Sequence, residues 1–287
     1  MKRDDDSLAC ARWSRLVSDR LAERARLSPS AGSVSGSFWN RRRADRYAAG
    51  VKLVNTEGDP LLGRLRRMTD ASSTVLDVGA GTGRFAVALA ASVRHVTAVD
   101  PSAAMLAVLQ RDALELGADN VGVVQATWEE ARASPADIAF SAYVLPLVPD
   151  ARAFLVKLDA AARRHVLLYL GAFCGDAVLD PLWRHFHGAP RAPGPSYLDA
   201  LAVVRELGAD PDIKVVEIAD HRRFATIDEA VEHYREALLL DDTPQVRTEL
   251  SGLLESWLLG RRGAFRPPLR TVPAAIIRWT PGQIRGG

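Results

Sequence analysis

The chain alternates short apolar runs with longer stretches in which apolar residues recur every three or four positions. The short runs predict five buried strands, at Val75–Val78, His95–Val99, Val121–Gln125, Ile138–Ala142 and His165–Leu170. Most of the stretches between them have helical periodicity, most clearly Arg84–Ser92 and Ser102–Leu116. Strands that alternate with helices form a parallel sheet with helices on both faces. The pattern therefore predicts a doubly wound α/β fold.

The pattern differs on both sides of this core. An amphipathic helix is predicted at Ala11–Leu27, and the run SPSAGSVSGS after it has the composition of a flexible linker, so we expect residues 1–37 to be loosely attached. After Leu170, an irregular stretch is predicted at Cys174–Pro195. The remaining predicted elements are helices at 38–53, 60–67, 196–207, 227–240 and 245–259 and strands at 213–218 and 272–279. The sheet is thus expected to have seven strands and to be mostly parallel.

Composition narrows the class of protein. The 287 residues are 48% hydrophobic with a net charge of +2, which is typical of a folded protein with a substantial core. No apolar run reaches the roughly 18 residues of a membrane span, and the first residues lack the apolar segment of a secretory signal, so a cytoplasmic chain without a membrane partner is expected. The two cysteines, Cys10 and Cys174, lack metal-ligand spacing.

The densest basic cluster is RRRADR at 41–46. It includes an acid, and no aromatic platform comes after it. We interpret it as a solvated helical face and not as a nucleic-acid surface.

The stretch VLDVGAGTGR, at 75–84, carries the strongest chemical signal. A glycine-rich turn between a strand and a helix lets the backbone approach a nucleotide-like ligand closely. Gly79, Gly81 and Gly83 form G-x-G-x-G, whereas the dinucleotide fingerprint requires G-x-G-x-x-G, and Arg84 holds its last position. The loop therefore predicts a nucleotide-like ligand and disfavours a dinucleotide.

A carboxylate comes directly after the second predicted strand. Asp100 lies 17 residues after Gly83, where the neighbouring strand would place it beside the glycine loop. A carboxylate in this place can accept hydrogen bonds from two ribose hydroxyls, as it does in dinucleotide folds. Its position alone does not choose between an adenosine donor and a nicotinamide dinucleotide.

DVGAGTG followed by AVDPSAAML resembles the class I S-adenosylmethionine-dependent methyltransferases, with the right order and spacing over Phe38–Leu170. The resemblance implies S-adenosylmethionine as cofactor, with the glycine loop around its methionine part and Asp100 on its ribose. The family's usual adenine acid is replaced by Ala126, so that Thr127, Trp128 or Glu129 would serve. The implied cofactor residues are Tyr47, Asp77, Gly79, Ala80, Gly81, Gly83, Asp100, Pro101, Ser102, Met105, Thr127, Trp128 and Ser141.

The pattern along the chain, taken together with this resemblance, predicts the domain organisation. Residues 1–37 would be an N-terminal helix and linker, and 38–287 a single methyltransferase domain. Within it, 38–70 would be a helical preface and 71–172 the cofactor-binding core. Residues 173–287 would form a lid-like insertion on the substrate side after the fifth strand, together with the final strands.

Methyl transfer from a sulfonium is an in-line displacement, so most of the rate acceleration can come from holding donor and acceptor in line. A base would help where the acceptor must lose a proton. Candidates are His185 and His187, which alternate as in an extended segment, and Tyr143 after the fourth strand. Two structural or surface histidines are the simpler interpretation. No third ligand at useful spacing accompanies them, so no metal site is expected.

The segment after the fourth strand disfavours some acceptors. SAYVLPLV differs from the Asn/Asp-Pro-Pro-Tyr/Phe box of the family's nucleobase-amine and glutamine enzymes, and Cys174 lacks the context of a catalytic RNA-methylating cysteine. A small-molecule acceptor is predicted, with oxygen as one option for the atom and a homodimer as one option for the assembly. Three alternatives stay open: an RNA methyltransferase, a non-catalytic S-adenosylmethionine-binding module and a nicotinamide-dependent oxidoreductase.

Overall fold

The computed structural model describes residues 8–27, 44–45, 47–48, 56–171, 179–260 and 265–285. Its centre is a seven-stranded sheet with the order β3-β2-β1-β4-β5-β7-β6. The bounds are β1 Thr74–Val78, β2 His95–Asp100, β3 Val121–Gln125, β4 Ala136–Ala142, β5 Ala162–Gly171, β6 Asp212–Ala219 and β7 Thr271–Trp279. The first five strands are parallel, and β7 runs antiparallel to both β5 and β6. The predicted α/β fold and strand number are confirmed.

The order of the strands positions the site. The chain winds outward from β1 through β2 to β3, and then returns to β4 on the other side of β1. Val75 pairs with Val96 on one side and with Ile138 on the other, so the carboxyl ends of β1, β2 and β4 meet at one edge. A crevice forms at such a reversal, because the connections leave these strands in opposite directions.

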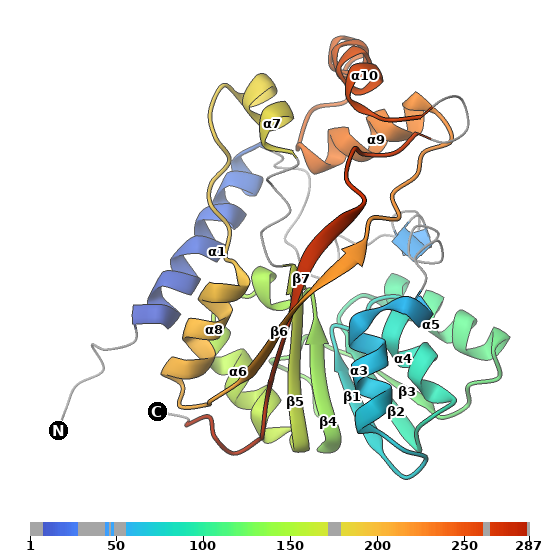
Figure 1. Cartoon of the computed structure of the whole chain (residues 1–287), viewed down its shortest axis with the longest axis vertical. Helices are drawn as coiled ribbons and strands as arrows, with labels where there is room; N and C mark the ends of the chain where they lie inside the picture. Colours follow the sequence, from blue (N-terminus) through green and yellow to red (C-terminus); the bar gives the residue numbers. More distant parts are fainter. Residues whose placement is uncertain are drawn as a thin grey trace.

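Helices cover both faces of the sheet (Figure 1). One face packs against α3 Pro60–Met68, α4 Arg84–Ala90 and α5 Ala103–Glu115, which bury Leu62, Phe85 and Leu109 against it. The other packs against α6 Ala151–Ala160 and α8 Tyr197–Glu206. Short 3-10 turns, η2 Thr56–Gly58 and η3 Leu145–Leu147, lie before α3 and after β4. None of the helices in the described ranges is long and apolar enough to cross a bilayer.

The N-terminal helix α1, Leu8–Leu27, is part of the second face. Trp13 and Val17 are fully buried in the same apolar cluster as α6 and α8. Trp13 Nε1 also donates a hydrogen bond to the carbonyl of Val148 at 2.9 Å. The expectation of loose attachment is therefore wrong for residues 8–27, because the apolar side of α1 is buried. The predicted linker at 28–37 lies outside the described residues.

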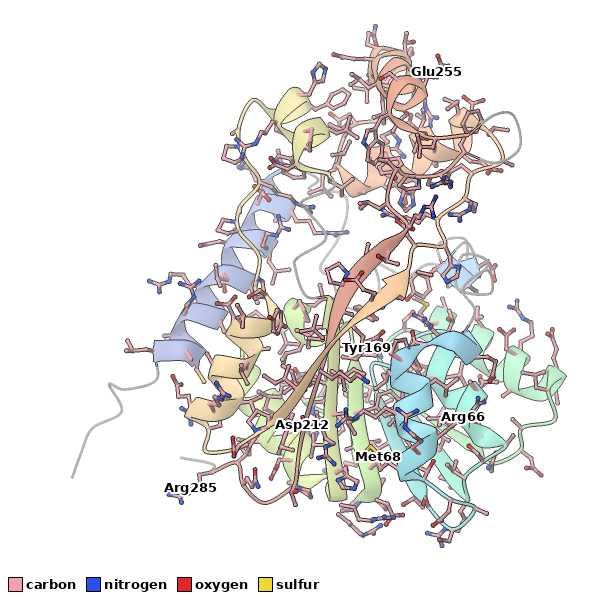
Figure 2. The ribbon with its side chains drawn as sticks, viewed as in Figure 1. Arg66, Met68, Tyr169, Asp212, Glu255 and Arg285 are labelled. Atoms are coloured by element: carbon pink, nitrogen blue, oxygen red, sulfur yellow. The ribbon has the colours of Figure 1, made fainter. Side chains whose placement is uncertain are left out.

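A separate group of helices stands above the carboxyl edge of the sheet (Figure 1). It consists of α7 Asp180–His187, α9 Ile227–Ala237 and α10 Pro244–Trp257, and we call it the upper helical unit. Its own apolar cluster includes Trp183, Tyr234 and Leu250. Figure 2 labels Glu255 of α10 at its top and Tyr169 of β5 below it.

The upper helical unit combines two stretches of the chain, since α7 comes after β5 whereas α9 and α10 lie between β6 and β7, where two helices were expected. The irregular structure expected over Cys174–Pro195 is wrong at 180–187, which is helical. Pro181 at the start, the αL conformation of Gly188 at the end and the burial of Leu182 and Trp183 stabilise this short helix.

Candidate functional site

A pocket of about 820 Å³ opens at the carboxyl ends of β1, β2 and β4. It lies at the reversal of strand order, and its volume is within the usual range for small-molecule sites. Eleven of the predicted site residues line it: Tyr47, Asp77, Gly79, Ala80, Gly81, Asp100, Pro101, Met105, Thr127, Trp128 and Tyr143. These eleven predicted residues therefore lie together around one pocket.

The structure requires glycine at the three positions of the loop for different reasons. All have positive φ, from +55° to +82°, which favours glycine. A Cβ on Gly79 would lie 2.1 Å from Cγ2 of Val144, and one on Gly83 would lie 2.6 Å from Cγ of Leu109. A Cβ on Gly81 would meet no protein atom within 4 Å among the described residues. Gly79 and Gly83 therefore permit close packing, whereas Gly81 leaves space at the pocket wall for a ligand.

Asp100 ends β2 and is held by backbone amides. Its Oδ2 accepts the N–H of Gly81 at 2.9 Å, and its Oδ1 accepts the N–H of Ser102 at 2.8 Å. Burial raises the pKa of Asp100, and these two hydrogen bonds oppose that shift. Each oxygen keeps a further lone pair, so the carboxylate can accept two hydroxyl donors from a ligand in the pocket.

Asp77 ends the apolar run of β1 and is 2% exposed. Burial, and then the nearby Asp100 carboxylate, raise the pKa of Asp77 to about 8, against a lowering by the backbone amide of Ala86. Its Oδ2 has no hydrogen-bond partner in the described part of the chain. A buried carboxylate oxygen without a partner is costly, and a cationic ligand group would compensate for it.

Three predicted cofactor residues do not line the pocket. Each of them instead stabilises a turn, a helix start or a strand end beside a residue that lines it. Gly83 makes the turn into α4. Ser102 caps α5 by accepting the N–H of Met105 at 3.3 Å, and Ser141 Oγ donates to the carbonyl of Val78 at 2.9 Å. These three residues therefore fix the backbone of the loops around the pocket.

On the β3 side of the pocket, Trp128 is a packing residue. It is buried, its Nε1 donates to the carbonyl of Phe154 at 3.2 Å, and Lys157 Nζ lies 4.7 Å from its ring centroid. Thr127 Oγ1 donates to Glu130 at 3.1 Å. The alternatives named for the adenine amino group, Thr127, Trp128 and Glu129, all line the pocket.

Tyr143 comes after β4 in a left-handed backbone conformation, with φ of +62°. Its N–H donates to the carbonyl of Tyr169 at 2.7 Å, which holds this turn against β5. Such a conformation is costly for a bulky residue, and it occurs preferentially at functional sites. Burial is the main cause that raises the pKa of Tyr143 to about 12. Its phenol is therefore protonated at neutral pH and can donate a hydrogen bond but cannot act as a base.

The two histidines lie elsewhere. His185 Nε2 is 2.7 Å from Glu249 Oε1 of α10, and His187 Nε2 is 2.8 Å from the carbonyl of Leu238. The ring of His187 also packs against Trp183, with centroids 4.2 Å apart. Both sit on α7 in the upper helical unit, and neither is among the described residues that line the pocket. Their interpretation as alternating positions of an extended segment is wrong, because residues 180–187 are helical.

Several pocket residues were not predicted. Leu21, Arg24 and Ala25 come from α1, and Leu147, Val148 and Phe154 come from the segment after β4 and from α6. No local signal marks them, since long-range packing brings them to the glycine loop. Arg84 also lines the pocket, and its place in the glycine motif could have identified it.

Comparisons with known proteins find similarities to methyltransferases. Residues 75–164 match the family model described as a methyltransferase domain. The YcgJ protein from Bacillus subtilis has a similar structure, with a TM-score of 0.53 and 18% identity over 79% of this chain and 98% of that one. A proposed methyltransferase from Bacillus halodurans C-125 has a TM-score of 0.54 and 17% identity, over 76% of this chain and 97% of that one. No curated protein matches the sequence.

A third structure, the magnesium protoporphyrin IX methyltransferase from Synechocystis PCC 6803 with bound SAH, has a TM-score of 0.49 and 15% identity over 97% of this chain and 100% of that one. The first two structures agree with the observed α/β fold. The family model confirms the predicted resemblance to methyltransferases over the glycine loop, β2, β3, β4 and α6.

Proposed function

Because residues 75–164 match the model of a methyltransferase domain, we propose that the chain transfers a methyl group from S-adenosylmethionine to a small-molecule acceptor. The observation that carries this proposal is the pair of carboxylates in the pocket. Asp100 is fixed by two backbone amides, whereas Asp77 has an oxygen without a partner among the described residues. The first suits a vicinal diol, and the second suits a cation.

The described residues fit this donor. Asp100 would hold the ribose hydroxyls, Asp77 would neutralise the ammonium of the methionine part, and the space at Gly81 admits the chain between them. Met105 and Thr127 would lie near the adenine. The donor, when bound, supplies an electrophilic methyl carbon on a sulfonium, and its sulfur leaves as a neutral thioether.

The contribution of the protein is positional. An in-line displacement needs the acceptor held opposite the sulfur and water kept out. Apolar side chains of Leu21, Val144 and Leu147 line the pocket and restrict water. The phenol of Tyr143, protonated at neutral pH, would orient an acceptor oxygen by donating a hydrogen bond to it.

The size of the pocket supports a small acceptor, since about 820 Å³ must hold the donor as well. The basic side chains that would favour RNA, Arg41, Arg42 and Arg43, lie outside the described residues. The cytoplasmic location and the homodimer stay predictions.

Binding experiments test the donor. We expect S-adenosylmethionine and S-adenosylhomocysteine to bind in calorimetric titration with micromolar dissociation constants, and a reduced nicotinamide cofactor not to bind. Binding of the nicotinamide cofactor alone would overturn the proposal. A radiolabelled methyl group then identifies acceptors in a panel of small metabolites.

A non-catalytic module is the second candidate. It is favoured by one observation: no histidine is among the described residues that line the pocket. Binding of both donor and product without methyl transfer to any acceptor in the panel would support it.

A further inference from the structure

Arg84 stands where the dinucleotide fingerprint has glycine. It is the first residue of α4, directly after the glycine loop, and it lines the pocket. Its side chain is 16% exposed, and its guanidinium lies 5.0 Å from the centroid of the Phe85 ring. A largely buried arginine is costly unless it is paired, so its position needs a reason.

Asp59 supplies part of that reason. Arg84 Nη2 donates to Asp59 Oδ2 at 2.6 Å, and the Asp59 side chain is fully buried. The other oxygen of Asp59 accepts the N–H of Leu61 and caps α3. This pairing fixes one edge of the guanidinium. Since arginine has five N–H donors, further donors are available for a planar anion.

The other groups that line the pocket indicate which anionic group Arg84 would bind. Arg84 and Asp77 both line it and flank the glycine loop, seven positions apart in the chain. A fixed cation and a buried carboxylate with an unpartnered oxygen are together complementary to an α-amino-acid zwitterion. The other arginine among the described lining residues, Arg24, comes from α1 together with Leu21 and Ala25.

We propose that Arg84 binds the α-carboxylate of the methionine part of the donor, while Asp77 binds its ammonium. The inference rests on the proposed function, because it takes S-adenosylmethionine as the ligand. It assigns a specific role to the residue that separates this loop from a dinucleotide loop.

Two probes isolate the interaction. S-Adenosylhomocysteine carries the amino-acid zwitterion, whereas 5′-methylthioadenosine has the same adenosine and thioether without it. Because Arg84→Gln alone would leave Asp59 buried and unpaired, we compare Asp59→Asn/Arg84→Gln with Asp59→Asn as its reference. Arg66→Gln is the surface control, since Arg66 pairs with the exposed Glu57 and does not line the pocket.

Calorimetric titration should show that the double variant binds S-adenosylhomocysteine roughly 10- to 100-fold more weakly than the Asp59→Asn reference. The affinity for 5′-methylthioadenosine should agree within about twofold in the two proteins. Arg66→Gln should match the unmodified protein for both probes.

Equal affinities of the double variant and its reference for S-adenosylhomocysteine would overturn the assignment. The assignment would also be overturned if Arg24→Gln alone weakened the binding of S-adenosylhomocysteine and the double variant did not. If the unmodified protein binds neither probe, the proposed function itself fails. Binding of 5′-methylthioadenosine separates that failure from failure of the inference.

Discussion

Asp77 and Asp100 are the same residue type in one pocket, but their environments give them different chemistry. Backbone amides satisfy Asp100 on both oxygens, whereas Oδ2 of Asp77 has no partner in the described ranges. The first is suited to neutral hydroxyl donors and the second to a cation. This difference leads to two ligand-binding predictions.

Asp100→Ala should weaken binding of both S-adenosylhomocysteine and 5′-methylthioadenosine by about 1.5–3 kcal/mol, since both contain the ribose. Calorimetric titration measures this, with circular dichroism as the check on folding. Loss of affinity for only one of the two ligands would place the ribose elsewhere, and so would unchanged affinity in a folded variant.

The pKa of Asp77 predicts a pH dependence. Its folded value of about 8 lies above the ordinary 3.8, so its contribution to the stability of the ligand-free protein is present at low pH and is lost as the pH rises through about 8. An ammonium ligand prefers the ionised form. The affinity for S-adenosylhomocysteine should therefore fall, by roughly tenfold from about pH 8 to about pH 6.5.

Two comparisons control this measurement. 5′-Methylthioadenosine has no ammonium and should show a shallower profile. In Asp77→Asn the profile for S-adenosylhomocysteine should flatten, because no carboxylate remains to titrate at this position. An unchanged slope in Asp77→Asn would assign the pH dependence to another group.

Among the elements, α1 contacts several parts of the fold. Trp13 anchors it to the segment after β4, Leu21 lines the pocket, and Leu27 packs against the upper helical unit. Its first turn is held by α8, because Glu206 accepts the N–H of Ala9 at 2.6 Å and that of Cys10 at 3.3 Å. A carboxylate in this place satisfies free amides and interacts favourably with the positive end of the helix.

Glu206→Gln should destabilise the first turn of α1 by roughly 0.5–1 kcal/mol and accelerate amide exchange there about two- to fivefold. Hydrogen exchange with mass spectrometry measures this over residues 8–14. Arg12→Ala is the control, because the partly exposed Arg12–Asp199 pair contributes little. Equal exchange in Glu206→Gln and the unmodified protein would contradict the capping role.

At the scale of the whole molecule, separate apolar clusters stabilise different parts of the fold. Two of them lie on the faces of the sheet, and another belongs to the upper helical unit. Units with their own core can open separately from the rest. The pocket is lined by α1 and by loops at the carboxyl edge of the sheet.

Leu250→Ala should therefore act locally. Leu250 is fully buried in the upper helical unit, so the substitution should cost about 2–5 kcal/mol there. Amide exchange should accelerate in α9 and α10, while the affinity for S-adenosylhomocysteine changes less than about twofold. Leu65→Ala is the matched variant, because Leu65 of α3 is fully buried in the apolar cluster against the sheet, and it should accelerate exchange in the sheet. Faster exchange in the sheet of Leu250→Ala would show a single cooperative unit.

The local pattern determined most of the sheet and the centre of the site. Buried strands are continuous apolar runs, so Val75–Val78 was predicted within one residue of the observed β1. The glycine loop and Asp100 are also local, because close backbone approach requires glycine at fixed positions and parallel strands bring their carboxyl ends together.

Tertiary structure decided what long-range packing controls. The apolar face of α1 is visible in the sequence, but its place beside the pocket depends on contacts with α8 and the segment after β4. The short helix α7 has too few turns to show a period, and its burial against α9 and α10 stabilises it. Pairing with Asp59, 25 positions away, holds Arg84, and burial sets the raised pKa of Asp77. Sequence spacing thus located the loop, whereas charge and hydrogen bonding within the pocket depend on groups that only folding brings together.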